Sequence, residues 1–281
     1  MIMSERRFAV IGHPIGHTMS PFIHKRLFEL AGLKGDYTVL DVAPEELPVR
    51  IDELNALDGY NITIPNKQRI IPFLDALDKK AELYGSVNTV KNGRIRTGYT
   101  TDPDGFLKAL ASAGIPFKGD VVIAGCGGVS RTFAYEAALA GCRVTIAVRP
   151  QSAEKQKALA LEIENKLGTE KINCCLLSEI SGEHDLFING TPSGMYPHTD
   201  EMPLSSKALA GFANVFDAVY NPLETKLIRA ARANGSRVCG GMSMLVWQAV
   251  VAHEIWDGTV YDTADIDLLI EESAGEQERK F

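Results

Sequence analysis

The chain has 281 residues, 45% of them hydrophobic and 23% charged, proportions that are typical of globular proteins and exclude a disordered or fibrous chain. Its length suits two domains of ordinary size. The formal net charge of −7 argues against nucleic acid as a partner, because phosphate binding favours a basic surface.

The amino-terminal residues run directly into a strand-like segment and lack the apolar stretch of a signal peptide. No apolar run is long enough to cross a membrane. The cysteines are odd in number and form no C-x-x-C pair, so we expect reduced thiols rather than disulfides or metal ligands. These features predict a cytoplasmic protein with no membrane partner. The cysteines in question are Cys126, Cys142, Cys174, Cys175 and Cys239.

Strand-like and helix-like segments alternate along the first hundred residues. We predict strands at 6–12, 37–42, 60–64, 87–90 and 95–99, and helical stretches that begin near residues 21, 44, 67 and 75. The last two strands flank an Asn92-Gly93 pair, which is typical of a hairpin turn.

A second series of elements follows residue 116. We predict strands at 120–124, 143–148, 172–177, 185–189, 214–219 and 237–240, and a surface helix at 153–167. An apolar helical stretch at 242–256 is expected to pack back on the first lobe, and the charged tail 271–281 to be frayed. The regular alternation indicates an α/β fold with mostly parallel strands.

A glycine-rich loop joins the first strand of the second series to the helix that follows. Residues 120–131 read DVVIAGCGGVSR, with glycines at 125, 127 and 128. Such glycines let the backbone approach a pyrophosphate, and the helix behind them directs unpaired N–H groups at that anion. The loop therefore predicts a Rossmann-like dinucleotide-binding domain; a tight turn without a ligand is the alternative.

The next strand ends at Arg149, and the first acidic residue after it is Glu154. In nicotinamide-binding folds a carboxylate near this point binds the adenosine ribose, whereas an arginine accommodates a 2′-phosphate. We therefore favour NADP over NAD as the cofactor, with NAD as the alternative. An exposed arginine with no ligand would give the same pattern.

Four polar segments end strands of the first lobe, at residues 12–21, 61–67, 86–89 and 100–102. Their hydroxyls, amides, lysine and aspartate suit a small polyhydroxylated carboxylic acid, since hydroxyl groups orient the acid and amides bind ring hydroxyls. His13, His17 and His24 lie in or beside the first segment, but they do not share a face and no acidic ligand lies between them, so we predict no metal site.

These segments resemble the signatures of the shikimate dehydrogenase family. Residues 12–21 are similar to its G-N-P-I-x-H-S-x-S-P motif, 61–67 to N-V-T-x-P-x-K, 86–89 to A-V-N-T and 101–102 to the T-D of N-T-D-G. Later, 125–131 resemble G-A-G-G-x-x-R, 189–195 N-x-T-x-x-G-M, 217–225 D-x-x-Y-x-P-x-x-T and 244–248 M-L-V-x-Q. The match runs in order from about residue 6 to 258.

The resemblance implies a role for each matching residue. Lys67 is the expected catalytic acid and base, paired with Asp102, because reduction of a ketone requires a proton for the new alkoxide. Thr18 and Ser20 would hold the substrate carboxylate. The expected substrate-binding set is Thr18, Ser20, Thr63, Lys67, Asn88, Asp102, Tyr220 and Gln248, and the cofactor-binding set is Gly125, Cys126, Gly127, Gly128, Val129, Arg149, Ala218 and Gly241.

The implied activity is the reversible NADPH-dependent reduction of 3-dehydroshikimate to shikimate, in the biosynthesis of chorismate and the aromatic amino acids. The implied fold has a substrate-binding domain at 1–101, on which 242–281 packs, and an NADP-binding Rossmann-like domain at 102–241, with the active site in the cleft between them. We expect a monomer or a homodimer.

Several residues depart from the family pattern. Thr18 replaces the commoner serine, and Ala153 stands where a second arginine often follows Arg149. Quinate oxidation with NAD therefore remains an alternative. A non-catalytic sensor of a ring acid is a second alternative, against which the retention of both Lys67 and Asp102 argues. A folate-type dehydrogenase would explain the glycine loop but not the first-lobe motifs.

Overall fold

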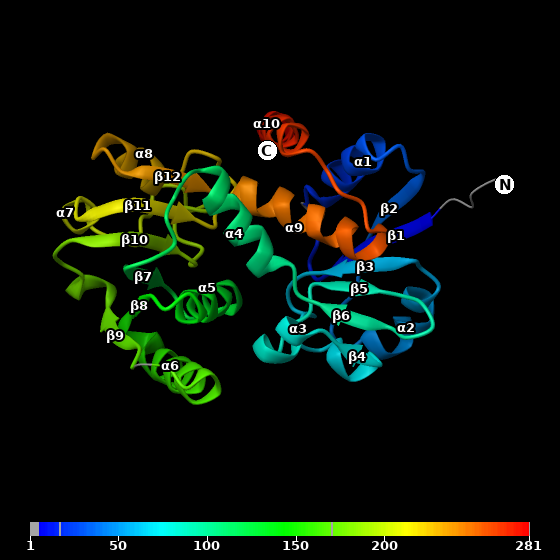
Figure 1. Cartoon of the computed structure of the whole chain (residues 1–281), viewed down its shortest axis with the longest axis horizontal. Coiled ribbons are helices and arrows are strands. Elements are labelled where there is room, and N and C mark those ends of the chain that lie inside the picture. The colour runs from blue at the N-terminus through cyan, green and yellow to red at the C-terminus, as the bar shows by residue number, and fades with distance from the viewer. Residues whose placement is uncertain (1–5, 17, 170, 281) are drawn as a thin grey trace. The chain divides into compact units, whose positions relative to one another are not determined.

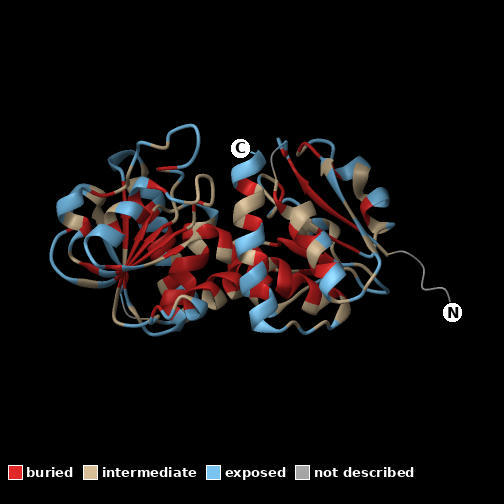
Figure 2. Ribbon diagram, turned by 90° about the horizontal axis from the view of Figure 1, so that it is seen from above, coloured by how far each residue is buried: buried red, intermediate tan, exposed pale blue. Residues whose placement is uncertain are grey.

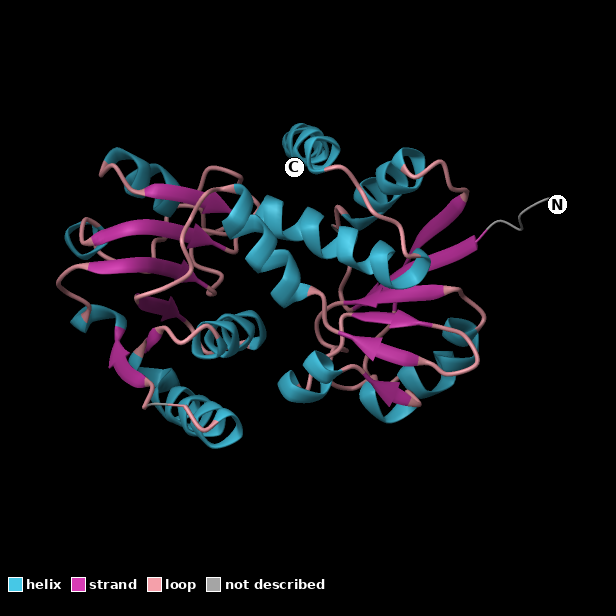
Figure 3. Ribbon diagram, viewed as in Figure 1, coloured by secondary structure: helices cyan, strands magenta, loops and turns pink. Residues whose placement is uncertain are grey.

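The computed structural model describes residues 6–16, 18–169 and 171–280 and divides into two compact units. The first comprises Met1–Gly105 and Val246–Glu276, and the second Phe106–Leu245 and Gln277–Phe281. Each unit contains a six-stranded sheet with helices beside it (Figures 1 and 3). Within the described ranges, no helix is both long and apolar enough to cross a membrane.

The first unit has a mixed sheet in the order β2-β1-β3-β5-β6-β4. Its β2-β1-β3 part is parallel, β5 runs antiparallel to both β3 and β6, and β4 is parallel to β6. The strands are β1 (Arg6–Gly12), β2 (Gly35–Asp41), β3 (Gly59–Ile62), β4 (Ala76–Leu77), β5 (Thr89–Lys91) and β6 (Thr97–Tyr99), and the helices include α1 (Ser20–Leu30), α2 (Leu47–Asn55), η1 (Ile71–Phe73) and α3 (Lys79–Tyr84).

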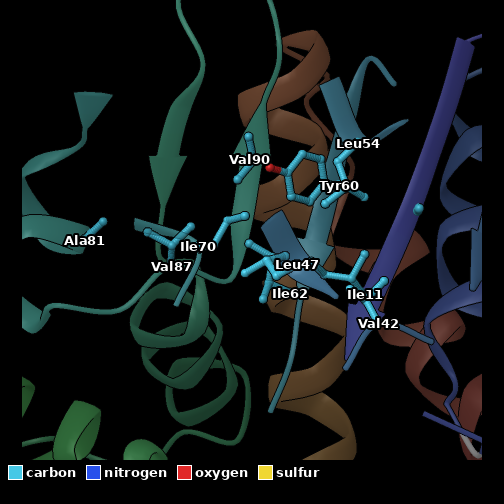
Figure 4. Packing of buried hydrophobic residues seen from close by; sticks show 11 residues of the cluster. Ile11, Val42, Leu47, Leu54, Tyr60, Ile62, Ile70, Ala81, Val87 and Val90 are labelled. Carbon is cyan, nitrogen blue, oxygen red and sulfur yellow. The ribbon is translucent and has the colours of Figure 1, made fainter. Parts of the chain in front are cut away.

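A hydrophobic core lies between this sheet and α2 (Figure 4). Leu47 and Leu54, seven residues apart, lie on one face of α2, and Ile11 and Ile62 reach them from β1 and β3. All four side chains are at most 2% exposed, so each contributes about 1.5–3 kcal/mol of hydrophobic stabilisation. This packing holds β1 and β3 in register, and the polar segments that follow both strands start from the same edge.

Two predicted helices of the first unit differ from the structure. Residues 67–70 form turns rather than a helix, because Pro72 would interrupt a helix that began at Lys67. The helix expected near residue 75 begins only at Lys79, where Asp78 caps it by accepting hydrogen bonds from the backbone N–H groups of Ala81 (2.8 Å) and Lys80 (3.3 Å).

The predicted hairpin is confirmed as β5 and β6, but its turn is different. Gly93 is not among the glycines with positive φ, so Asn92-Gly93 does not form the two-residue turn that its sequence suggests. The Asn92 side chain instead donates hydrogen bonds to the carbonyl oxygens of Leu54 (2.7 Å) and Leu57 (2.9 Å). The asparagine ties the hairpin to the end of α2.

The second unit has a fully parallel sheet in the order β12-β11-β10-β7-β8-β9. If the strands of this unit are numbered 1 to 6 from β7 to β12, the order is 6-5-4-1-2-3, which is that of doubly wound dinucleotide-binding folds. This order confirms the predicted fold class. The strands are β7 (Asp120–Ala124), β8 (Arg143–Val148), β9 (Asn173–Leu176), β10 (His184–Asn189), β11 (Phe212–Asp217) and β12 (Arg237–Gly240).

The central strands β7, β10 and β11 of this sheet are largely buried, whereas the edge strands β9 and β12 are partly exposed (Figure 2). The run from Val121 to Ala124 in β7 is at most 1% exposed, which explains why it is continuously apolar rather than alternating. The helices and 3₁₀ turns of the unit are most of α4 (Asp102–Ser112), α5 (Gly128–Leu139), η2 (Pro150–Ser152), α6 (Ala153–Leu167), η3 (Leu177–Glu179), α7 (Ser206–Leu209), α8 (Lys226–Ala233) and the start of α9 (Gly241–Asp257).

The tail that we predicted to be frayed is helical as far as Lys280, within α10 (Thr263–Lys280). Ile266, Leu269, Ser273 and Gln277 follow one another at helical spacing, and each is at most 3% exposed. The prediction was wrong because the last two residues of this buried face, Ser273 and Gln277, are polar. The apolar pattern in the sequence therefore ends several residues before the helix does.

Two histidines form a buried pair in the first unit. His24 Nδ1 lies 3.0 Å from His253 Nε2, and the hydroxyl of Tyr261 lies 2.9 Å from His253 Nδ1. Burial lowers the pKa of His253 to about 3, and the positive charge of Arg6 acts in the same direction. Burial also lowers the pKa of His24 well below its ordinary value, and repulsion by His253 adds to this. Both rings are therefore neutral in the folded protein.

Neutral buried histidines stabilise the fold at neutral pH and lose this contribution as the pH falls. Unfolding exposes both rings to protonation below about pH 6.5, so the free energy of unfolding should fall by up to about 1.4 kcal/mol per pH unit for each ring. We expect His253→Gln to reduce the dependence of the free energy of unfolding on pH by about 1 kcal/mol per pH unit. This slope is measured by denaturant unfolding at a series of pH values between about pH 7 and pH 4.

The exposed His198 provides the control, and His198→Gln should keep the wild-type slope. An unchanged slope in His253→Gln would contradict the proposed origin of the acid sensitivity.

Candidate active site

Lys67 and Asp102 meet in the first unit. The Nζ atom of Lys67 lies 2.6 Å from Oδ2 of Asp102, which is a hydrogen-bonded ion pair. The lysine side chain is 28% exposed and the aspartate side chain 12%, so the ammonium group can be reached from solvent while the carboxylate is largely covered. Lys67 lies in the turn after β3 and Asp102 begins α4, so the pair joins segments 35 residues apart.

Asn88 connects this pair to three neighbouring groups. Its Nδ2 lies 2.9 Å from Asp102 Oδ1, 3.0 Å from Gln248 Oε1 and 3.0 Å from Thr101 Oγ1, and the two amide hydrogens serve two of these acceptors at a time. Its Oδ1 accepts a hydrogen bond of 2.8 Å from the backbone N–H of Thr101. The amide is 2% exposed and fixes both Asp102 and Gln248.

Thr18 and Ser20 form a second polar group at the start of α1. The Thr18 hydroxyl donates to Ser20 Oγ at 3.1 Å and accepts a bond of 3.2 Å from the backbone N–H of Ser20. Both residues are half-buried. Thr63 is also half-buried; it follows β3, and its backbone N–H donates to the carbonyl oxygen of Ile11 at 2.8 Å.

Sequence reasoning missed three residues that lead by hydrogen bonds to Asn88, namely Tyr37, Asn61 and Thr89. Tyr37 is half-buried, and its hydroxyl donates to Asn61 Oδ1 at 2.6 Å. Asn61 Nδ2 then donates to Thr89 Oγ1 at 3.0 Å, and the Thr89 hydroxyl donates to Asn88 Oδ1 at 3.1 Å. A continuous network therefore runs from Tyr37 to the Lys67–Asp102 pair. The signal for Asn61 lay in the 61–67 motif, whereas Tyr37 looked like an ordinary strand residue.

The histidines near this site have local partners. His13 Nδ1 lies 2.7 Å from Asp41 Oδ1, and His24 belongs to the buried pair with His253. His17 lies outside the described residues. Within the described ranges, no group of three or more His, Cys, Asp or Glu side chains is arranged to hold a metal ion.

The glycine loop of the second unit lies at the point where the strand order of its sheet reverses. β7 and β10 are neighbours there, and doubly wound folds bind ligands at the carboxyl ends of such strands. The loop follows β7 and leads into α5, whose N-cap is Gly127 with no side-chain cap. The N–H groups of the first turn therefore have no intrahelical partner and are available to an anion.

The glycines of this loop fit a dinucleotide. Gly125 has φ +101°, and a Cβ there would lie 2.7 Å from Ser130 Oγ and 3.0 Å from Thr191 Cγ2. At Gly127 and Gly128, by contrast, no heavy atom of a described residue would lie within 4 Å of a Cβ. The first glycine thus makes the tight turn and the other two leave open space in which a pyrophosphate can approach the backbone.

The remaining predicted cofactor residues lie at the same edge of the sheet. Arg149 follows β8 and is exposed, and Cys126 and Val129 are half-buried in the glycine loop. Ala218 follows β11 and Gly241 follows β12; the N–H of Gly241 donates to the carbonyl oxygen of Val219 at 3.2 Å. Tyr220, which we predicted to bind the substrate, follows β11 in this second unit, and burial raises the pKa of its hydroxyl.

A buried carboxylate that we did not single out holds this edge together. Asp217 is fully buried and accepts hydrogen bonds from Asn189 Nδ2 (2.9 Å), the backbone N–H of Val219 (3.1 Å) and the Thr225 hydroxyl (2.6 Å). Burial raises the pKa of this carboxyl group, although the three donors oppose the rise. The contacts fix the ends of β10 and β11 and so position Ala218.

Comparison with known proteins agrees with this geometry. A family profile described as "Shikimate dehydrogenase substrate binding domain" matches residues 10–90. The chain is 37% identical over 277 residues to the shikimate dehydrogenase (NADP(+)) of Caldanaerobacter subterraneus subsp. tengcongensis, with 96% of each chain covered. It is 39% identical over 258 residues to the protein of that name from Methanocaldococcus jannaschii, covering 89% of this chain and 90% of that one.

The structure is also similar to a solved one. The shikimate 5-dehydrogenase of Thermus thermophilus, crystallised with NADP(H) and shikimate, superposes with a TM-score of 0.85 at 33% sequence identity. The match covers 95% of this chain and 99% of that chain, so it includes both units.

Replacing Gly125 with alanine should weaken NADPH binding. The substitution adds a Cβ to a left-handed residue and pushes it against Ser130 and Thr191, so the loop must move away from its tight turn. We expect the dissociation constant for NADPH, measured by calorimetry, to rise at least tenfold, which corresponds to a loss of roughly 1.4 kcal/mol of binding free energy.

Gly141→Ala is the matched control. Gly141 also has positive φ, +72°, but a Cβ there meets no heavy atom of a described residue within 4 Å. Both variants should lose about 1–2 kcal/mol of stability from backbone strain, whereas only Gly125→Ala should affect the cofactor. Equal NADPH affinities in the two variants would show that the turn at Gly125 is not needed for binding.

Proposed function

The chain belongs to the shikimate dehydrogenase family, and on that premise we propose that it reduces 3-dehydroshikimate reversibly to shikimate with NADPH. This reaction serves the biosynthesis of chorismate and the aromatic amino acids. The observation that carries the proposal is the contact of 2.6 Å between Lys67 Nζ and Asp102 Oδ2 inside a network of polar side chains.

Side chains of the first unit supply most of the proposed substrate contacts. The hydroxyls of Thr18 and Ser20, 3.1 Å apart, suit the two oxygens of the substrate carboxylate. Asn88 and Gln248 are oriented by their mutual hydrogen bond, which leaves the remaining amide hydrogens of Gln248 for a ring hydroxyl. Thr63 and Tyr220 complete the proposed set.

Lys67 is the proposed acid and base. As the ring carbonyl becomes an alkoxide, the ammonium group donates a proton from Nζ to that oxygen, and in the reverse direction the neutral amine accepts it. Asp102 accepts a hydrogen bond from Nζ and thereby fixes the direction of the other N–H bonds. Because Asn88 holds the second carboxylate oxygen at 2.9 Å, the aspartate is kept from rotating away.

We propose that the second unit binds the cofactor. When bound, NADPH supplies the hydride for the ketone. The loop from Gly125 through Cys126, Gly127 and Gly128 to Val129 offers backbone N–H groups to the pyrophosphate, and the exposed Arg149 offers a bidentate guanidinium to the 2′-phosphate. Ala218 and Gly241 present backbone at the ends of β11 and β12, where a flat ring can lie against them.

The two alternative functions have less support. The relatives described above carry the name of an NADP-dependent shikimate dehydrogenase, which does not favour quinate with NAD. A sensor without catalytic activity has no need of a lysine and an aspartate held at hydrogen-bonding distance.

The location and assembly of the enzyme are part of the proposal. Five free cysteines, one buried and none paired, suit the reducing conditions of the cytoplasm. A single chain supplies every side chain of the proposed site, which is compatible with either a monomer or a homodimer.

A matrix of steady-state rates tests the function directly. We expect oxidation of shikimate with NADP to have a kcat/KM at least about tenfold above that for shikimate with NAD or quinate with either cofactor, which corresponds to about 1.4 kcal/mol of transition-state discrimination. The rates are followed by absorbance of the reduced cofactor. A higher kcat/KM with quinate and NAD would replace the proposed substrate, and no turnover in any combination would support the sensor.

Lys67→Ala should abolish most of the proton transfer. We expect kcat to fall by roughly two to four orders of magnitude, with a modest change in KM, because the residue acts mainly on the transition state. Lys80→Ala is the control, since Lys80 also pairs with an aspartate, Asp104, at 2.6 Å but lies outside the proposed site. Near-normal turnover in Lys67→Ala would remove the lysine from the mechanism.

A further inference from the structure

The hydrogen bonds that lead from Tyr37 to Asn88 run in one direction. The Tyr37 hydroxyl donates to the side-chain oxygen of Asn61 at 2.6 Å, so the amide nitrogen of Asn61 faces the other way and donates to Thr89 Oγ1 at 3.0 Å. The Thr89 hydroxyl, which has accepted this bond, gives its own hydrogen to Asn88 Oδ1 at 3.1 Å. Reversing any one amide would place two donors or two acceptors face to face.

Packing fixes both ends of this chain of hydrogen bonds. The Tyr37 ring stacks on His24, with the ring centroids 4.0 Å and the planes 8° apart, and His24 is only 2% exposed. At the other end, Thr89 is fully buried and Asn88 is 2% exposed. Hydrogen bonds in such surroundings are little weakened by water, and successive bonds polarise one another. The chain therefore transmits a fixed orientation from β2 to Asn88.

The amino group of Asn88 has more acceptors than hydrogens. Its Nδ2 lies within 3.0 Å of Asp102 Oδ1, Gln248 Oε1 and Thr101 Oγ1, although it carries only two hydrogens. The plane of the amide decides which two acceptors it serves. The Thr89 hydroxyl and the backbone N–H of Thr101, at 2.8 Å, both hold the amide oxygen and so set that plane. Without the Thr89 bond, the amide is free to turn toward the Thr101 hydroxyl.

We propose that Tyr37 and Thr89 are positioning residues, which act on the direction of the Asn88 amide. Held in this way, the amide serves Asp102, which orients the proposed proton donor, and Gln248, which is proposed to bind a ring hydroxyl. This role rests on the proposed function. Neither Tyr37 nor Thr89 belongs to the proposed substrate-binding set, so both act on the reaction through Asn88.

Thr89→Val removes the hydroxyl and keeps nearly the same shape. We expect kcat/KM for shikimate with NADP to fall about tenfold, through both a lower kcat and a higher KM for shikimate, because Asn88 serves both catalysis and binding. The KM for NADP should stay within about twofold, since the whole chain of hydrogen bonds lies in the first unit. Thr89→Ser keeps a hydroxyl and should retain at least about half of the wild-type kcat/KM. Tyr37→Phe acts from further away and should lower it about threefold.

Hydrogen exchange of the Asn88 side-chain amide reports the position of this group without any turnover. It is followed by NMR on the full chain without ligands, and the resonance is assigned by its absence in Asn88→Asp. We expect the two hydrogens to exchange at least about tenfold faster in Thr89→Val than in the wild type, because an amide that changes partners opens to water more often.

Tyr261→Phe is the matched control. It also removes a hydroxyl that forms hydrogen bonds within the first unit, 2.9 Å from His253 Nδ1 and 3.1 Å from the carbonyl oxygen of Leu27. This hydroxyl is not part of the chain that leads to Asn88, so the variant should keep the wild-type kinetics and the wild-type exchange at Asn88.

The outcomes separate this role from the function on which it rests. If the wild type does not oxidise shikimate but Thr89→Val speeds exchange at Asn88, the proposed function fails and the positioning of the amide stands; unchanged exchange would remove that as well. If the wild type oxidises shikimate and Thr89→Val does so with normal kcat and KM, the function stands and the positioning role is wrong. An equal loss in Tyr261→Phe, or no rescue by Thr89→Ser, would also overturn it, because general destabilisation would then explain the effect.

Discussion

The hydrogen-bonded pair of Lys67 and Asp102 is the interaction on which the proposed chemistry of this protein depends. A partly exposed ammonium group is a mobile proton donor unless another charge holds it, and the largely covered carboxylate does so at 2.6 Å. Asn88 in turn holds the carboxylate, and the backbone N–H of Thr101 holds Asn88. Each member is therefore positioned by the next, and the last is the main chain itself.

The second unit depends on a comparable arrangement of backbone and buried charge. The left-handed turn at Gly125 leads from β7 into α5, while Asp217 fixes the ends of β10 and β11 through three neutral donors. Among the described residues Asp217 has no cationic partner, and a carboxylate that is buried in this way is costly unless its oxygens accept hydrogen bonds. The proposed cofactor-binding segments of this unit are thus positioned by backbone geometry more than by individual side chains.

Much of the fold followed from the sequence because the central strands of the second unit are largely buried. Apolar runs such as 120–124 and 143–148 have clear ends, and their predicted bounds agree with β7 and β8. The errors arose where local pattern and tertiary contact disagree. Pro72 prevents a helix after Lys67, Asn92 serves α2 rather than a tight turn, and Ser273 and Gln277 are polar residues on a buried helix face.

The candidate site shows the same division. Lys67, Asp102, Asn88 and Gln248 could be named from motifs, because short polar segments at strand ends keep a recognisable order. Tyr37 could not, since nothing in its neighbourhood in the sequence distinguishes a buried hydroxyl from a core ring. Its role depends on Asn61, 24 residues away, and only the folded chain brings the two together.

The crowding around Asn88 has a consequence for anyone wishing to redesign substrate choice. Its carbonyl oxygen already serves a main-chain group, and its amino group is shared among three acceptors. A substitution of Asn88 would disturb both the start of α4 and the Asp102 carboxylate, so it would also change the proposed acid–base pair. Thr63, another member of the proposed substrate set, is half-buried, and its methyl group lies where a Cβ at Gly12 would be, so a change there would meet the loop after β1 instead of α4.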